Sequence, residues 1–251
     1  MPTTDVAVEE ASAPTLPVNG GEKRTFVRGM FSAIAPRYDL LNHLLSLSLD
    51  RWWRRRALRE LRWERAPSGT YVDLCAGTLD VAAMLAKRAG FSGRVIGADF
   101  AEPMLRAGRE KAPADVVAPV VADALELPLQ NGAADGAIVA FGIRNVSDLD
   151  AALREMHRVL ASGARFVILE FTTPRLRLVR ALYHFYFHRV LPVVGGIISG
   201  HPLAYRYLPE SVANFPAEEE LGARMRAAGF SDVSWTSLTL GVAAIHVGAK
   251  S

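Results

Sequence analysis

The sequence has few of the features that tie a chain to a membrane, a metal or an oxidising compartment. It contains one cysteine, Cys75, in 251 residues, so an intrachain disulfide and a Cys/His zinc cluster are both excluded. We therefore expect a reducing compartment and no metal site. No window holds about 18 uninterrupted apolar residues, the length that a helix needs to cross a bilayer.

The sequence also lacks a strong excess of charge of one sign. Its 29 Lys and Arg residues against 26 Asp and Glu residues give a net charge of +3, which does not imply a surface that coats nucleic acid. Arginines are nevertheless crowded among tryptophans over residues 51–65. This stretch is interpreted either as a solvated helix face with the tryptophans in the core, or as a contact for anionic lipid headgroups or phosphate.

Residues 1–21 hold no apolar run and include Glu9 and Glu10, so they do not read as a secretory signal. We expect a disordered leader and a cytoplasmic protein. The chain as a whole has the composition of an ordinary globular protein, with 50% hydrophobic and 22% charged residues. A chain of this length can bury a sizeable core without disulfides or metal.

Helical spacing over residues 22–61 changes at Thr70 to short β-prone runs that alternate with helices. Pro36 divides the first region, because proline cannot donate the helix hydrogen bond. Strands are predicted at 71–75, 94–98, 116–121, 136–141, 164–171, 233–239 and 242–249, and later helices at 80–89, 103–111, 149–160 and 217–228.

This alternation predicts right-handed crossovers and a parallel sheet with helices on both faces. The short turn at Leu240 and Gly241 forces the last two strands into an antiparallel hairpin. The predicted fold is α/β and Rossmann-like, with a seven-stranded, mostly parallel sheet containing one antiparallel strand. We predict a leader at 1–21, an N-terminal helical lid at 22–66, and a ligand-binding domain at 67–251 with an apolar insertion at 176–210.

Three strand-to-helix turns carry aspartates at the sheet edge where open α/β folds bind ligands. Asp73 lies in the first turn. Asp99 ends the second strand, where a carboxylate can accept both hydroxyls of a ribose, and Asp123 and Ala124 follow the third, beside an adenine edge. The alternative for Asp73 and Asp99 is a role in helix capping or in the turns themselves.

The first turn lacks the G-x-G-x-x-G pattern that cradles the pyrophosphate of a dinucleotide. Gly77 is followed by Thr78 and Leu79, which leaves poor room for a diphosphate but adequate room for a nucleoside without one. The reversed strand also differs from the all-parallel dinucleotide-binding arrangement. S-adenosyl-L-methionine is therefore the expected cofactor, rather than NAD.

Several motifs also occur in order along the chain. They are VxxMFxxIAxxYDxxN at 27–42, DLCAGT at 73–78, FGIRNV at 141–146, LEF at 169–171, YRYLxES at 205–211 and LTxGVAxxH at 238–246. Together they make the chain resemble the ubiquinone/menaquinone-biosynthesis C-methyltransferase family, within the class I S-adenosylmethionine-dependent methyltransferases. The resemblance implies that fold from about residue 27 to residue 250.

The resemblance also implies cofactor contacts at Thr78, Asp99, Ala140 and the pair formed by Asp123 and Ala124. Two residues depart from the family pattern. Leu79 stands where the family has glycine, so its side chain must be accommodated by a repositioned helix or a shifted methionine tail, and its effect on cofactor affinity stays open. Ala140 stands where relatives often have serine or glycine and leaves only a backbone contact.

Methyl transfer to carbon is an in-line displacement that needs donor and acceptor aligned about 3–3.5 Å apart. An aromatic carbon becomes nucleophilic when a neighbouring hydroxyl loses its proton, which requires a base, or a cation and donors that stabilise the phenolate. Arg144 and Asn145 are the candidate catalytic residues, with Arg144 stabilising the phenolate or positioning water. The alternative is a loop ion pair with Asp148 or Asp150 and a helix cap.

Tyr38, Asp39 and Asn42 are candidate substrate-binding residues that close over the acceptor, or else they cap and pack the N-terminal helices. Tyr183 lies in an aromatic run that is either core and lid or a path for a polyprenyl tail, beside a cationic rim. His184, His201 and His246 are expected to be structural.

The leading hypothesis is an S-adenosylmethionine-dependent C-methyltransferase that acts on a polyprenyl hydroquinone, demethylmenaquinol. Expected partners are this lipophilic quinol and the inner face of a membrane as a peripheral contact, with no nucleic acid; a homodimer stays open. One alternative is a methyltransferase of the same fold with another small aromatic or secondary-metabolite acceptor. Another is a non-catalytic scaffold that has lost cofactor binding through Leu79.

Overall fold

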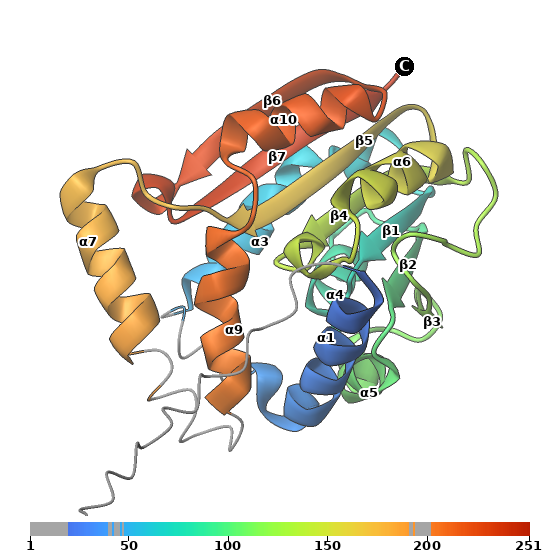
Figure 1. Ribbon diagram of the computed structural model, residues 1–251. Helices are drawn as coiled ribbons and strands as arrows, with labels where there is room; N and C mark the ends of the chain where they lie inside the picture. The colour runs from blue at the N-terminus through green and yellow to red at the C-terminus, as the bar shows by residue number, and fades with distance from the viewer. Residues whose placement is uncertain (1–19, 40–41, 43–45, 47, 191–192, 194–201) are drawn as a thin grey trace, which may run out of the picture.

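The computed structural model describes residues 20–39, 42, 46, 48–190, 193 and 202–251. A seven-stranded sheet in the order β3-β2-β1-β4-β5-β7-β6 runs through its centre (Figure 1). Neighbouring strands are parallel except that β7 runs antiparallel to both β5 and β6, which confirms the predicted sheet. The strands are β1 Thr70–Leu74, β2 Arg94–Asp99, β3 Val117–Val121, β4 Ala134–Ala140, β5 Leu160–Phe171, β6 Phe230–Leu238 and β7 Ala243–Lys250.

Helices cover both faces of the sheet, as predicted. One face packs against α3 (Leu49–Glu60), α4 (Asp80–Ala86) and α5 (Glu102–Gly108), and the other against α6 (Leu149–Val159) and α10 (Glu218–Ala227). Successive strand residues point to opposite faces, so Tyr71 belongs to the first core and its neighbour Val72 to the second. Short 3-10 turns complete the chain at η2 Trp63–Arg65, η3 Arg109–Lys111, η4 Ile143–Asn145 and η6 Thr239–Gly241.

Helices α1 and α3 of the N-terminal region serve different surfaces. α1 (Gly20–Ile34) ends where Pro36 starts the turn η1 (Ala35–Arg37), so the predicted division at this proline is confirmed. α1 lies beyond the carboxyl ends of the strands, whereas α3 packs on the sheet through Trp53 and Leu58. The predicted lid range therefore includes a core helix. Residues 1–19 of the predicted leader lie outside the described residues.

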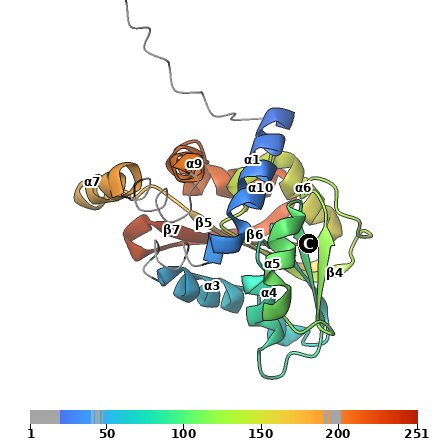
Figure 2. The same ribbon diagram turned by 90° about the horizontal axis from the view of Figure 1, so that it is seen from below.

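The described parts of the apolar insertion include two helices on the same side of the sheet as α1 (Figure 2). These are α7 (Arg177–Phe185), which continues into the π-helical turn η5 (Tyr186–Val190), and α9 (Pro202–Ala213). Across the described parts of the chain, no helix is both long enough and apolar enough to cross a bilayer. His201 lies outside those parts.

Candidate active site

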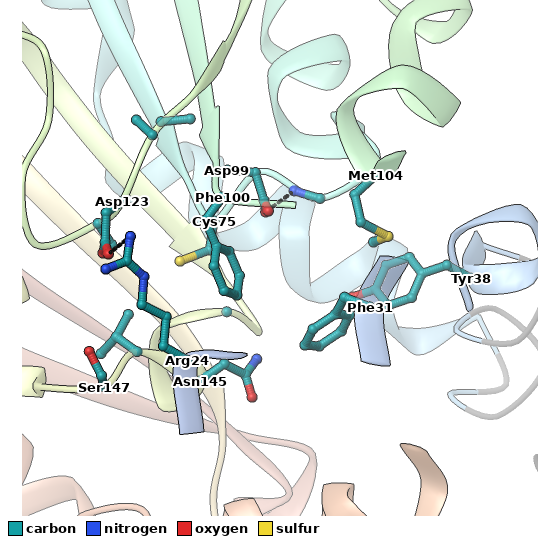
Figure 3. Close-up of a pocket in the computed structure, with 16 residues that line it drawn as sticks. Arg24, Phe31, Tyr38, Cys75, Asp99, Phe100, Met104, Asp123, Asn145 and Ser147 are labelled. Atoms are coloured by element: carbon teal, nitrogen blue, oxygen red, sulfur yellow. Dashed lines mark hydrogen bonds and ion pairs between the residues drawn. The ribbon is translucent and has the colours of Figure 1, made fainter. Parts of the chain in front are cut away.

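A crevice opens at the carboxyl ends of β1, β2, β3 and β4, where three of the predicted turns meet (Figure 3). Helix α1 and the residues after it supply its outer wall. The crevice is lined, among others, by Cys75, Gly77, Asp99, Asp123, Ala124 and Asn145 from the strand ends, and by Arg24, Phe31 and Tyr38 from the N-terminal region. We call it the cofactor crevice.

Asp99 is fixed in this crevice by backbone amides. Its two carboxylate oxygens accept hydrogen bonds from the amides of Gly77 (2.9 Å) and Ala101 (2.8 Å). Burial raises the pKa of Asp99, and these amides lower it in part. Gly77 has a φ of 52°, a conformation that glycine adopts readily. The first turn and the second strand are thus joined into one wall of the crevice.

Asp123 lies in the crevice opposite helix α1. Arg24 of α1 forms an ion pair with it, with an Nη2 to Oδ2 distance of 3.0 Å (Figure 3). The two side chains are 55% and 21% exposed, and a pair so open to solvent stabilises the fold only slightly. A ligand can therefore take the place of Arg24 on this carboxylate at little cost.

Asp73, Thr78 and Ala140 line a small cavity next to the crevice. The Asp73 carboxylate accepts a hydrogen bond from the backbone amide of Ala82 in α4 (2.9 Å). This is the helix-capping role that was the alternative for Asp73 in the sequence analysis. The Thr78 hydroxyl donates a hydrogen bond to Asp39 and accepts one from Lys111 (2.9 Å). Asp39 is thus engaged at the rim of this cavity, together with Lys111.

The structure places the Leu79 side chain away from the cofactor crevice. Its side chain is fully buried in the core and lines neither the crevice nor the small cavity. It occupies space over Gly97 of β2, where a Cβ would collide with its Cδ2. A leucine fits here because the glycine beneath it in the sheet has no side chain.

A second pocket adjoins the crevice and the small cavity, and Tyr38 lines all three. We call it the acceptor pocket. Burial raises the pKa of Tyr38, while a hydrogen bond with Asn42 and the charges of Arg54 and Arg144 lower it. The pocket's polar lining residues are Tyr38, Asn42, Ser46, Asp50, Arg54, Arg144, Tyr186 and Tyr207, and its apolar ones are Met30, Phe31, Ile34, Phe141, Phe171, Phe187, Ala204 and Leu208.

Arg144 is anchored at the wall of the acceptor pocket. Its Nη1 donates to Glu170 Oε1 (2.7 Å) and to the carbonyl of Phe141 (2.5 Å), and its Nε donates to Ser211 (3.3 Å). Its guanidinium lies over the ring of Phe171, 5.6 Å from the centroid. Among the residues that the structure describes, no partner of Nη2 is found, so this nitrogen is the donor left for a ligand.

Arg144 does not form the loop ion pair with Asp148 or Asp150 that was the alternative for this segment. Asp148 caps α6 by accepting a hydrogen bond from the Ala151 amide (2.9 Å), and Asp150 lies 3.3 Å from Arg224. Glu170, which is only 1% exposed, holds Arg144 instead. Burial raises the pKa of Glu170, and Arg144 opposes this shift.

Two buried polar atoms in these cavities have no hydrogen-bond partner in the described part of the chain. They are Oδ1 of Asn145, in the crevice, and the hydroxyl of Tyr207, in the acceptor pocket. An unsatisfied buried polar atom is costly, so a hydrogen-bonding group of a ligand would stabilise either position. The Tyr183 hydroxyl is also unpartnered there, but Tyr183 stacks on Phe187, with centroids 4.1 Å apart, and does not line the pocket.

Sequence reasoning missed residues of the acceptor pocket and its wall, among them Asp50, Arg54, Glu170 and Tyr207. Asp50 and Arg54 were hidden in the arginine-rich stretch, where their spacing of four is the only local signal. Arg54 is 5% exposed and so departs from a solvated helix face. Glu170 and Tyr207 lie in motifs that were recognised without a role for either residue.

Comparison with known proteins agrees with this geometry. The model of the ubiE/COQ5 methyltransferase family matches residues 18–250. A demethylmenaquinone methyltransferase of Thermus thermophilus is 55% identical over 223 residues, which cover 88% of this chain and all of the relative. A ubiquinone/menaquinone biosynthesis C-methyltransferase UbiE of Geotalea uraniireducens is 46% identical over 233 residues, or 91% and 98% of the two chains.

Solved structures share the fold at low sequence identity. A S-adenosylmethionine-dependent methyltransferase of Thermotoga maritima, described as a possible histamine N-methyltransferase, has a TM-score of 0.58 at 21% identity and covers 90% of this chain and 100% of its own. The [4+2]-cyclase SpnF has a TM-score of 0.65 at 16% identity, covering 95% and 99%. With the family model matched over nearly the whole chain, this protein belongs to the ubiE/COQ5 methyltransferase family.

Proposed function

We propose that this protein transfers a methyl group from S-adenosylmethionine to a ring carbon of a polyprenyl hydroquinone, with demethylmenaquinol as the expected acceptor. The observation that carries the proposal is an aromatic-walled pocket, next to the cofactor crevice, that contains an anchored guanidinium whose Nη2 has no partner among the described residues. The names of the relatives from Thermus and Geotalea support the same chemistry.

The residues of the crevice suit the cofactor. Oxygen atoms of Asp99, Asp123 and Asn145 can accept hydrogen bonds from its hydroxyl and amino groups, and Phe100 and Met104 offer apolar contact to a purine. The unpartnered Oδ1 of Asn145 is the part of the crevice that most needs a ligand donor. When bound, S-adenosylmethionine supplies an electrophilic methyl group on a cationic sulfur.

The role assigned to Arg144 is to stabilise the negative charge that develops on a ring oxygen of the acceptor. A guanidinium stays protonated at any physiological pH and donates in a fixed plane, so its Nη2 can stabilise negative charge on a ring oxygen while Glu170 holds the other side of the group. Stabilisation of charge that develops in the transition state contributes to turnover more than to ground-state binding. Arg144 therefore acts on the acceptor, and Asp99 on the cofactor.

We also propose that α7 brings the protein to the membrane where such an acceptor resides. Leu178, Leu182 and Phe185 recur at helical spacing and are 75%, 63% and 63% exposed. Arg177 and Arg180 lie on the same helix, as expected for contact with anionic headgroups. The following turn η5 supplies Phe187 to the acceptor pocket, which connects this surface to the site.

Methylation of demethylmenaquinol by the purified protein with labelled S-adenosylmethionine tests the function. Arg144→Ala should lower turnover by roughly 100-fold or more and change affinity for S-adenosylhomocysteine little, whereas Asp99→Ala should weaken that affinity strongly. Arg106→Ala, in an exposed pair with Glu102, is the matched control. Absence of methylated product across quinol analogues would contradict the proposal, and equal loss of cofactor affinity in both variants would contradict the division of roles.

A further inference from the structure

The acceptor pocket contains a buried carboxylate that the roles above leave unused. Asp50 near the start of α3 is 3% exposed, and Arg54, one turn later, is 5% exposed. Both line the pocket, and they form an ion pair with each other. Ser46 donates its hydroxyl to Oδ1 of Asp50 at 2.7 Å. Burying charges costs free energy that their attraction does not always recover, so this pair calls for a functional reason.

The chemistry of Asp50 is that of an acceptor. An ionised carboxylate has about four lone-pair sites and no hydrogen to donate, so Asp50 can accept several hydrogen bonds at once, those from Arg54 and Ser46 and one from a ligand hydroxyl included. Arg54, the ion-pair partner of this carboxylate, has its guanidinium 5.4 Å from the centroid of the Phe141 ring. The rings of Phe141 and Phe171 pack with their centroids 4.6 Å apart and their planes tilted by 34°, and the Arg144 guanidinium lies over Phe171. The guanidinium groups of Arg54 and Arg144 thus flank one pair of aromatic rings.

The pocket therefore offers two kinds of polar partner to a ligand. Arg144 Nη2 donates, whereas Asp50 only accepts. A hydroquinone has two hydroxyl groups, so it can accept from Arg144 at one oxygen and donate to Asp50 from the other. A quinone has two carbonyl oxygens and no hydrogen to donate, so one of them would face the carboxylate unpaired.

We propose that Asp50 selects the reduced acceptor by accepting its hydroxyl hydrogen, and that it disfavours binding of the oxidised quinone. This inference rests on the proposed quinol methylation. The selection keeps the electron-poor quinone ring, which is a poor nucleophile, from occupying the pocket. A hydrogen bond to a carboxylate is also stronger than one between neutral groups, and it increases electron density on the ring that must attack the methyl group.

The test is equilibrium dialysis of the full chain against 2,3-dimethyl-1,4-naphthohydroquinone and its quinone in oxygen-free buffer. Both ring carbons next to the oxygens are blocked, so neither form can be methylated there or add to the Cys75 thiol. The wild-type protein should bind the hydroquinone at least about tenfold more tightly, which is the factor expected for one hydrogen bond to a charged group. Asp50→Asn should remove or reverse this preference, mainly by tighter binding of the quinone, because the amide can donate.

Two control variants and one further ligand show whether the preference depends on the carboxylate of Asp50. Asp50→Glu keeps an acceptor-only group and should retain the preference. Glu60→Gln makes the same chemical change on the same helix, in the corresponding ion pair with Arg56, but away from the pocket, and should bind as the wild type does. If Asp50→Asn fails to fold, 1,4-dimethoxy-2,3-dimethylnaphthalene, which has no hydroxyl, should bind the wild-type protein about tenfold more weakly than the hydroquinone.

The possible outcomes separate this inference from the proposed function. A folded Asp50→Asn variant with an unchanged preference, or a dimethyl ether that binds as well as the hydroquinone, overturns the role of Asp50 and leaves the methyl transfer standing. Binding of both redox forms with equal affinity by the wild-type protein does the same. Failure of the wild-type protein to bind any naphthalene ligand overturns both the acceptor class and the inference.

Discussion

Leu79 precedes α4 in a left-handed backbone conformation, with a φ of 61° and a ψ of 23°. For a residue other than glycine this conformation costs roughly 1–2 kcal/mol. Complete burial of the side chain in the core contributes roughly 1.5–3 kcal/mol in return. The turn tolerates leucine because its side chain fills the space above Gly97, and the cofactor crevice is left open.

Two substitutions at Leu79 should separate these contributions. Leu79→Ala should lower the free energy of unfolding by about 2–5 kcal/mol, as expected for a leucine removed from a core. Leu79→Gly removes the same side chain but relieves the backbone, so it should be at least as stable as the alanine variant, the reverse of the usual order. Urea denaturation measures both. Calorimetry should show S-adenosylhomocysteine affinity close to that of the wild type, and a large loss would place Leu79 in the site after all.

Asp73 is a carboxyl group whose pKa burial raises to about 7. The unfolded chain releases this proton near pH 4, so between about pH 4 and 7 the folded state binds more protons and its stability falls as pH rises. Asp73→Asn cannot ionise, and its amide oxygen can still accept from Ala82. The variant should therefore gain stability relative to the wild type between pH 5 and pH 8, measured by urea denaturation of the ligand-free protein. A pH-independent difference would contradict this assignment.

At the scale of elements, helix α1 is attached to the rim of the site by its first turns. Lys23 donates to the carbonyls of Arg144 and Val146, both at 2.9 Å, and Arg24 pairs with Asp123. Burial and the charge of Arg144 lower the pKa of Lys23. These contacts tie α1 to η4, the turn that positions the candidate catalytic residues, so order in one element supports order in the other.

Lys23→Met should therefore loosen η4. Hydrogen bonds from a charged donor contribute about 1.5–3 kcal/mol, so exchange of the Asn145 and Val146 amides, which close the turn onto Gly142 and Ile143, should become about tenfold faster or more. Hydrogen–deuterium exchange measures this directly. Arg28→Met, an equivalent change at an exposed position of the same helix, is the control. Unchanged protection in the Lys23 variant would show that η4 is ordered without α1.

At the scale of the whole molecule, the described insertion joins an exposed apolar surface to the acceptor pocket. α7 lies at the periphery in both views (Figures 1 and 2). Its Leu178, Leu182 and Phe185 side chains are exposed, while η5 reaches the pocket through Phe187. A lipophilic acceptor that stays partly in a membrane needs a protein that docks with its pocket facing the lipid. Under the proposed membrane contact, α7 would be this docking surface.

Sedimentation with vesicles of phosphatidylcholine and phosphatidylglycerol tests this docking. Replacing Leu178, Leu182 and Phe185 together with serine should weaken vesicle binding at least about tenfold, because each buried side chain contributes more than 1 kcal/mol. Val121→Ser, at another exposed apolar position, should bind as the wild type does. Binding of the triple variant at wild-type affinity would exclude α7 as the contact.

Much of the fold was predictable from the sequence because it rests on local rules. The alternation of strands and helices determined the parallel sheet, and the short turn at Leu240 and Gly241 determined the reversed strand. Parallel strands end at one edge, so the convergence of Asp99 and Asp123 also followed from the order of the strands. Family motifs added the expected chemistry without any coordinates.

Only the tertiary structure decided which side chains meet. Arg144 and Glu170 are 26 residues apart, and the acceptor pocket unites Asp50, Arg144 and Tyr207 from three distant segments. The direction of the Leu79 side chain depended on an unoccupied space above Gly97 in another strand. Such contacts come from packing between elements, which the periodicity of a single segment does not encode, so the sequence located the site while the folded chain assigned its partners.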